Sequence, residues 1–214
     1  GDHRDLHLSI RRQRQMCIRD RTNSGSSANL VGVQSLNLKK GSKVITPSLT
    51  FSTTVSPIVQ SGLTPFFIDV EKETMQIDTS LLKKLPLDGV SAICVPNLIG
   101  NVANWEEIYH FAKENNLKTI EDSADTIGYK YLTDIENWSD VSTTSFYASH
   151  VVTGAGFGGM TCFSDKENYD LGLSLRGWGR RSSLYGETED YERRFDAKID
   201  GINYDDKYIF DDLA

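Results

Sequence analysis

Short apolar runs alternate with helix-like stretches along most of this chain, between about residue 23 and residue 176. Six runs have the length and composition of strands, at residues 44–46, 64–70, 91–95, 118–122, 143–147 and 159–163. Four stretches have helical periodicity instead, at residues 26–38, 53–60, 79–84 and 105–115. This alternation is typical of strand–helix–strand units around a largely parallel sheet. The sequence therefore predicts an α/β fold with a mostly parallel, open sheet flanked by helices.

Local signals refine these elements. Pro57 disfavours a long helix at residues 53–60, because proline lacks the N–H that a helix interior uses. Asp78 is a good N-cap for the helix that starts at residue 79. Residues 182–206 are charged and have no clear period, so we expect a long loop there.

The composition excludes several classes of protein. With 214 residues, 38% of them hydrophobic and 25% charged, the chain is ordinary for a globular protein. No stretch approaches the ~18 consecutive apolar residues of a membrane helix, so we expect a cytoplasmic protein with no membrane partner. Cys17, Cys94 and Cys162 are widely spaced, which predicts reduced thiols and no metal site.

The first 21 residues differ from the rest of the chain. They hold six arginines and no lysine, whereas the remainder is lysine-rich and acidic. A basic arm on an acidic body can indicate a nucleic-acid-binding tail. Residues 12–21, however, resemble translated sequencing-adapter DNA. We therefore predict that residues 1–21 are not native to the protein, and we expect no nucleic-acid partner.

Small hydroxylated residues open the first predicted helix, in the stretch Ser24-Gly25-Ser26-Ser27-Ala28-Asn29. The N-terminus of a helix presents unpaired N–H groups and the positive end of its dipole, so it can hold a phosphate. An ordinary serine N-cap is the structural alternative.

A group of acidic side chains begins at the end of the strand at residues 118–122. In Glu121-Asp122-Ser123-Ala124-Asp125, a carboxylate at the strand end can pair with a protonated ring nitrogen of a bound cofactor. The alternative is a loop of solvated acids. Because ligands bind beyond the carboxyl ends of strands in open α/β sheets, this position favours the first interpretation.

Three further residues stand at predicted strand ends or junctions. Phe51 is either a core residue or an aromatic platform, and Ser145 is either a plain strand serine or a ligand-binding hydroxyl. His150 can move a proton, since an unperturbed histidine titrates near pH ~6.5, although a lone histidine is more often a structural hydrogen-bonder. The glycine-rich run at residues 153–159 lacks the spacing of a dinucleotide fingerprint or a Walker loop.

Taken in order, these motifs resemble the sugar-nucleotide aminotransferases, which are fold type I pyridoxal-phosphate (PLP) enzymes. That family reads Ser-Phe-x-x-x-Lys before its glycine-rich strand entry, and the lysine binds PLP covalently. This chain has His150 in place of the lysine. A small branch with the same exchange resembles nucleotide-linked 4-keto-6-deoxyhexose 3-dehydratases, which bind pyridoxamine phosphate (PMP) without a covalent link.

The resemblance implies a role for each candidate residue. His150 would be the catalytic base, Asp122 would contact the ring nitrogen, and Asp125 replaces the family's usual Gln or His. The remaining positions match the ring-stacking aromatic residue and the phosphate ligands of the family, namely Phe51, Gly25, Ser26, Ser27 and Ser145. In the glycine-rich run one residue is inserted and the family's glutamate is missing, which leaves the conformation of that loop open.

The resemblance also implies a reaction. The amine of PMP condenses with the C4 ketone of the sugar, His150 removes a proton from the cofactor, and the C3 hydroxyl group leaves. Such a step belongs to lipopolysaccharide or deoxysugar biosynthesis. The expected partners are a sugar-nucleotide substrate and, in the full-length protein, a second copy in a homodimer.

The length of the chain predicts its division into domains. Family members run to roughly twice this length, so we expect a fragment, with a PLP/PMP-binding large domain at residues 22–181. Residues 182–214 would be a loop and the truncated remainder of that domain.

One kind of dehydratase carries an iron–sulfur cluster on cysteines, but Ser123 and Ala124 stand at the first cysteine positions here. We therefore expect the kind without a cluster.

Three other functions stay open from sequence. A sugar aminotransferase would share the fold, the cofactor and the substrate class. A non-catalytic homologue would bind a sugar nucleotide without turning it over. A nucleic-acid-binding module would depend on the arginines of residues 1–21.

Overall fold

A seven-stranded, mostly parallel sheet forms the centre of the computed structural model, which describes residues 18–126 and 138–177. Its spatial order is β1-β7-β6-β5-β4-β2-β3. The strands are β1 (Ile18–Thr22), β2 (Lys43–Pro47), β3 (Thr64–Ile68), β4 (Val90–Pro96), β5 (Lys118–Asp122), β6 (Val141–Ser145) and β7 (Gly159–Phe163). The pairs from β3 to β6 are parallel, whereas β7 is antiparallel to both β6 and β1.

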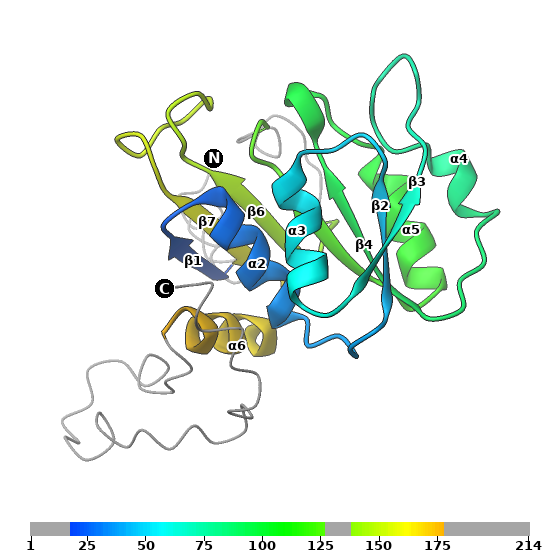
Figure 1. Ribbon diagram of the computed structural model, residues 1–214, viewed down its shortest axis with the longest axis horizontal. Coiled ribbons are helices and arrows are strands. Elements are labelled where there is room, and N and C mark those ends of the chain that lie inside the picture. Colours follow the sequence, from blue (N-terminus) through cyan, green and yellow to red (C-terminus); the bar gives the residue numbers. More distant parts are fainter. Residues whose placement is uncertain (1–17, 127–137, 178–214) are drawn as a thin grey trace, which may run out of the picture.

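Helices cover both faces of the sheet (Figure 1). They are α2 (Gly25–Ser35), α3 (Ser52–Gln60), α4 (Thr79–Leu82), α5 (Trp105–Glu114) and α6 (Lys166–Arg176), together with a short 3-10 turn, η1 (Leu98–Gly100). Helices α2 and α3 pack on one face, and α4 and α5 pack on the other. All six predicted strands and all four predicted helices are present, so the predicted fold class is confirmed.

Strand β1 was not predicted, and it begins inside residues 1–21, which the sequence analysis predicts are not native to the protein. Ile18–Thr22 pairs with Phe163–Gly159 of β7, and the Asp20 carboxylate contacts Arg176 Nη1 at 2.6 Å. An unpaired sheet edge presents free N–H and C=O groups that any extended segment can satisfy. This pairing is made by backbone atoms, so the pattern of apolar residues does not predict it. The origin of residues 1–21 stays a prediction.

Helix α6 was also missed. Its leucines, Leu171, Leu173 and Leu175, recur in steps of two and hide the helical period. The signals that could have found it are at its ends. Asp165 is the N-cap and accepts a hydrogen bond from Asn168 N at 2.8 Å, and Gly177 stands at the C-terminal end.

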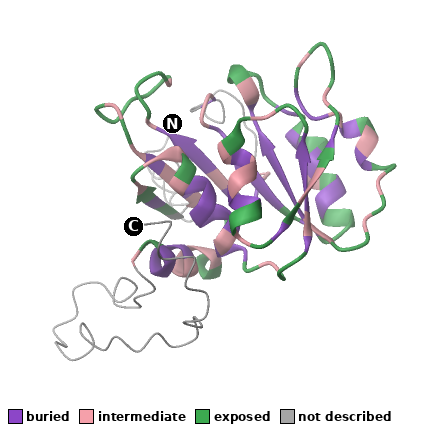
Figure 2. Ribbon diagram, in the orientation of Figure 1, coloured by how far each residue is buried: buried purple, intermediate pink, exposed green. Residues whose placement is uncertain are grey.

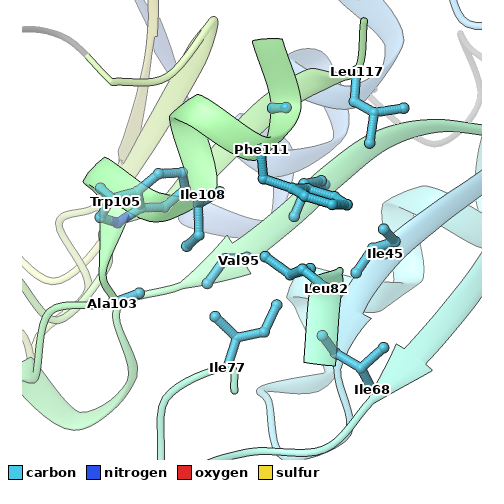
Figure 3. Close-up of a cluster of buried hydrophobic side chains, with 12 residues drawn as sticks. Ile45, Ile68, Ile77, Leu82, Val95, Ala103, Trp105, Ile108, Phe111 and Leu117 are labelled. Carbon is cyan, nitrogen blue, oxygen red and sulfur yellow. The ribbon is translucent and has the colours of Figure 1, made fainter. Parts of the chain in front are cut away.

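Two apolar cores lie on opposite faces of the sheet, and most of the central strands are buried (Figure 2). On β2, Val44 packs toward α2 and α3, whereas its neighbour Ile45 packs toward α4 and α5. Figure 3 shows the core on the α4 and α5 face, in which Trp105, Ile108 and Phe111 of α5 face the strands. Because successive strand residues point to opposite faces, both faces of these strands are apolar, as expected for a parallel sheet.

The same alternation decides where the polar ends of the strands point. Ile120 of β5 packs in the core beneath α2 and α3, so Asp122, two residues later, faces those helices. Val141 of β6 lies in that core too, and Thr143 and Ser145 follow it on the same face. Polar groups of β5 and β6 therefore meet near the N-termini of α2 and α3.

Pro57 lies inside α3 rather than ending it. A proline has no N–H to donate to the carbonyl four residues earlier, here that of Thr53. The Thr53 carbonyl accepts a hydrogen bond from Asn29 Nδ2 of α2 at 3.1 Å instead. The proline that disfavours a long helix in the sequence thus frees an acceptor for the neighbouring helix.

The loop predicted at residues 182–206, and the domain boundary predicted at residue 181, lie outside the described residues. Within the described ranges, none of the helices is both long and apolar enough to cross a membrane.

The contact between α6 and β7 yields a stability prediction. A Cβ on Gly172 would lie 2.6 Å from Cζ of Phe163, a ring that is fully buried. Gly172→Ala should therefore destabilise the chain by about 1–3 kcal/mol, although a glycine-to-alanine change in a helix ordinarily stabilises it by up to ~1 kcal/mol. Chemical denaturation measures the difference. Glu167→Ala, at an exposed position of the same helix, is the control, and a Gly172→Ala variant as stable as wild type would contradict this packing.

Candidate active site

A pocket of about 680 Å³ opens at the carboxyl ends of β4, β5 and β6, beside the N-termini of α2 and α3. It lies at the edge of the sheet that the parallel topology predicts for a ligand. Seven of the eight predicted site residues line it, and these are Gly25, Ser26, Phe51, Asp122, Asp125, Ser145 and His150. Ser27 does not line it.

The N-terminus of α2 forms one end of the pocket. Ser24 is the N-cap, and its hydroxyl oxygen accepts a hydrogen bond from Ser27 N at 3.1 Å. Ser27 is therefore part of the helix cap. The N–H groups of Gly25 and Ser26 lie in the first turn, where a helix offers them no carbonyl, so they are available to an anion.

Close packing holds this helix end against β6. A Cβ on Gly25 would lie 2.6 Å from Cβ of Ser145, so only glycine allows the two backbones to approach this far. Ser145 ends β6, and its hydroxyl oxygen accepts a hydrogen bond from Tyr147 N at 3.3 Å. A hydroxyl group and a helix N-terminus thus converge on one region of the pocket.

The carboxylate of Asp122 lies at the end of β5, 7% exposed. Its Oδ2 accepts hydrogen bonds from Thr54 Oγ1 and Asn29 Nδ2, both at 2.8 Å, and its Oδ1 accepts one from Ala124 N at 3.2 Å. Burial raises the pKa of Asp122, and these three hydrogen bonds oppose that rise. The carboxylate is poised to gain from a cationic ligand.

His150 and Asp125 form a pair across the pocket. His150 Nδ1 lies 3.1 Å from Asp125 Oδ1, and Asp125 Oδ2 accepts a hydrogen bond from Ile99 N at 3.2 Å. Ile99 has a left-handed backbone with φ 58°, which is rare for a β-branched residue. The carboxylate therefore links the imidazole to a strained turn at the rim of the pocket.

Phe51 stands at the N-cap position of α3, and its side chain is 66% exposed. Exposure of a large aromatic ring beside a pocket excludes the core interpretation and fits a surface for a flat ligand. Tyr147, also largely exposed, lies at the same pocket, and its ring and that of His150 are in a T-shaped arrangement with centroids 6.1 Å apart.

The glycine-rich loop, whose conformation the sequence left open, does not line the pocket. Phe146 N donates to Gly158 O, and Gly154 N donates to Phe146 O, both at 2.9 Å. Gly158 also forms a bridge with Ser24, and a Cβ on Gly159 would lie 2.2 Å from Ser24 O. The loop supports the N-terminus of α2 from outside the pocket.

Several pocket residues escaped the sequence analysis, among them Asn29, Thr54, Asn97 and Ile99. Asn29 carried a usable signal, since it is a polar residue on the buried side of α2. Asn97 directly follows β4, beside Asp122 at the end of β5, and it donates to Glu121 Oε1 at 3.0 Å. In the described part of the chain, no group of His, Cys, Asp and Glu side chains has the arrangement of a metal site.

Comparison with known proteins assigns a family. Residues 15–204 match the model of the DegT/DnrJ/EryC1/StrS aminotransferase family. The lipopolysaccharide biosynthesis protein RfbH of Salmonella typhimurium is 35% identical over 90% of this chain and 47% of its own length. The dTDP-4-dehydro-2,6-dideoxy-D-glucose 3-dehydratase of Saccharopolyspora spinosa is 36% identical over 88% of this chain and 43% of its own length.

A solved structure agrees with this assignment. The GDP-4-keto-6-deoxy-D-mannose-3-dehydratase of E. coli, determined with hydrated PLP, superposes with a TM-score of 0.72 and 31% identity. The match covers 78% of this chain and 44% of that one, so the chain spans less than half the length of these relatives. The matched pattern, the α/β fold and the position of the pocket agree, and the chain belongs to the DegT/DnrJ/EryC1/StrS aminotransferase family.

Proposed function

We propose that the protein carrying this chain is a PMP/PLP-dependent enzyme that removes the C3 hydroxyl group of a nucleotide-linked 4-keto-6-deoxyhexose. The observation that carries the proposal is His150. Its imidazole lines the pocket and contacts Asp125, and the described residues that line the pocket include no lysine. The dehydratases among the relatives support the substrate class.

The residues fit a pyridoxal-type cofactor. A phosphate group suits the N–H groups of Gly25 and Ser26 together with the Ser145 hydroxyl. The exposed ring of Phe51 offers a stacking surface for a flat heterocycle. The buried carboxylate of Asp122 suits a protonated ring nitrogen, because a cation beside it would offset the cost of burying its negative charge.

Within this site each side chain has a defined task. The cofactor, when bound, supplies an electron sink that makes proton removal and loss of a hydroxyl group possible. Asp125 accepts from Nδ1 of His150 and thereby holds the ring, which leaves Nε2 to take or return a proton. Ionised Asp122 would hold a protonated ring nitrogen of the cofactor through its carboxylate.

The identity of the base separates this proposal from an aminotransferase. An aminotransferase of this family needs an amine that binds the cofactor covalently, and imidazole cannot form that link. His150 therefore favours dehydration, in which the cofactor stays unlinked and a proton carrier suffices. A non-catalytic homologue would need neither the Asp125 contact nor an ionisable group at residue 150.

Other features of the whole protein belong to the same proposal. We infer a cytoplasmic homodimer in lipopolysaccharide or deoxysugar biosynthesis, without an iron–sulfur cluster. Ser123, at one expected cysteine position, donates to Glu121 Oε1 at 2.7 Å and so has a structural role. Iron and sulfide analysis of anaerobically purified protein tests the absence of the cluster.

Substitution of His150 tests the base in the full-length product of this reading frame. His150→Asn should bind PMP nearly as well as wild type and lose dehydration by a factor of ~10²–10⁴, because the proton carrier is gone. His150→Lys should gain a covalent PLP link that borohydride traps, which wild type lacks. Absorbance, mass spectrometry and turnover of the 4-keto sugar nucleotide provide the measurements.

The matched controls are His110→Asn and His110→Lys. His110 is an exposed residue of α5 that does not line the pocket. Neither control should alter turnover or trap PLP at residue 110. Full activity in His150→Asn would show that His150 is structural and would remove the basis of the proposal.

The Asp122 carboxylate predicts a pH dependence of stability. Burial raises its pKa in the folded state, so the contribution of Asp122 to the stability of the cofactor-free chain should be fully present below the unfolded pKa of ~3.9 and be lost as the pH rises through the folded pKa. Asp122→Asn should lose less stability over that pH range. PMP should stabilise wild type at neutral pH and bind the variant ~10-fold to 100-fold more weakly.

Thermal unfolding between pH 4 and pH 8, with and without PMP, measures both effects. Asp88→Asn, which removes an exposed carboxylate, is the control and should follow wild type. Equal PMP affinity of wild type and Asp122→Asn would exclude a contact between this carboxylate and the cofactor.

A further inference from the structure

One buried amide lies behind the Asp122 carboxylate. Asn29 is 5% exposed and is the one asparagine of α2, whose other buried residues are apolar or small. Burial of an amide costs free energy unless its donors and acceptor are satisfied. Asn29 makes hydrogen bonds to three different elements of the fold, which are α3, β5 and β6.

The partners fix which way the amide points. Its nitrogen lies 2.8 Å from Asp122 Oδ2 and 3.1 Å from the Thr53 carbonyl oxygen, and both of these atoms accept hydrogen bonds. An amide oxygen placed there would face two acceptors. The NH₂ group must therefore face Asp122, and the Thr143 hydroxyl of β6 donates to the amide oxygen at the other end.

The Thr53 carbonyl is available because of Pro57. In a regular helix this carbonyl would accept from the N–H of residue 57, which proline lacks. Thr53 O, Asp122 Oδ2 and Thr143 Oγ1 thus satisfy the amide on every side. Three residues far apart in the sequence hold one side chain in a single orientation.

The result is an asymmetric carboxylate. Asn29 and Thr54 both donate to Oδ2 of Asp122 and occupy its two acceptor sites, whereas Oδ1 accepts only the longer bond from Ala124 N in the described structure. Oδ1 therefore keeps an acceptor site. Asp122 lines the pocket, so this is the oxygen that can meet a ligand.

We propose that Asn29, oriented by Thr143 and by the carbonyl that Pro57 frees, is a positioning residue that keeps Asp122 ionised with Oδ1 turned to the ligand. The inference rests on the proposed function only in naming a pyridine ring nitrogen as the ligand. Asn29, Thr143 and Pro57 thereby contribute to the site, although the sequence motifs gave none of them a role.

The electrostatic setting makes this role necessary. Asp125, on the loop after β5, raises the pKa of Asp122, in addition to the larger effect of burial. On β4, burial and the Asp122 charge raise the pKa of the Cys94 thiol, so that group stays neutral. Hydrogen bonds from Thr54, Asn29 and Ala124 oppose the rise at Asp122. Removal of the Asn29 donor should shift the balance toward the protonated acid.

The first experiment uses the chain without cofactor. Asn29→Leu keeps the approximate size of the side chain and removes both its donor and its acceptor. Titration of the Asp122 carboxyl group, followed by carbon NMR of labelled protein, should show its pKa moved upward in Asn29→Leu. Thr143→Val should move it in the same direction by less, because the amide loses the partner at its oxygen.

Thr161→Val is the matched control. Thr161 is also a buried strand threonine that donates to α2, through Ala28 O at 2.9 Å, but it has no link to Asp122. It should leave the Asp122 titration unchanged even if it lowers the unfolding temperature. A shift in Thr161→Val equal to that in Thr143→Val would mean that loosening of α2 alone explains the effect, and would overturn the proposal.

The second experiment adds PMP to the same variants. Asn29→Leu should weaken PMP binding on the order of 10-fold to 100-fold, and the absorbance of bound PMP should report loss of the ring-nitrogen proton at lower pH than in wild type. In an Asp122→Asn background, Asn29→Leu should have little further effect, since it acts through the carboxylate.

The two readouts separate this inference from the proposed function. If wild type fails to bind PMP, the proposed function falls, and the cofactor-free titration still decides the role of Asn29. If Asn29→Leu leaves both the Asp122 titration and PMP affinity unchanged, Asn29 is not a positioning residue. Equal effects of Asn29→Leu in the wild-type and Asp122→Asn backgrounds would contradict the proposed route through Asp122.

Discussion

The candidate site depends on one buried carboxylate at the end of a parallel strand. Asp122 is almost completely removed from water, and hydrogen bonds from α2, α3 and the loop after β5 hold it there. A desolvated carboxylate is unfavourable in an empty pocket and favourable next to a cation. Burial of the Asp122 carboxylate therefore lowers the stability of the empty chain, and a bound cation would offset that cost. This is common where function opposes stability.

The rest of the architecture brings partners to that carboxylate. Parallel strands end at one edge of the sheet, and the helices that follow or precede them begin at the same edge (Figure 1). The N-terminus of α2 lies beside β6 and β7 because Gly25 permits close approach to Ser145, and Gly159 permits close approach to Ser24. The N-terminus of a helix, a buried carboxylate and an exposed aromatic ring are consequently gathered in a single pocket.

His150 gives this pocket its chemical character. The fold is shared with aminotransferases of the same family, whereas an imidazole at residue 150 can carry a proton but cannot form a covalent link to the cofactor. The contact with Asp125 holds Nδ1, and the strained turn at Ile99 holds Asp125. In the proposed function, this difference in side-chain chemistry on a shared fold separates dehydration from amino transfer.

The sequence by itself determined the fold class, because strands that are buried on both faces must be continuously apolar and helices must show their own period. It also identified His150, Asp122 and Phe51, since their motifs are local. Strand β1 and helix α6 escaped because one is held by backbone pairing and the other by caps and packing. Only the tertiary structure decided that Asn29 and Pro57 belong with Asp122, and that the glycine-rich loop lies outside the pocket. Hydrogen bonds between residues 24 to 114 positions apart leave no periodic trace in a sequence, and they exist only once the sheet has set the register of its strands.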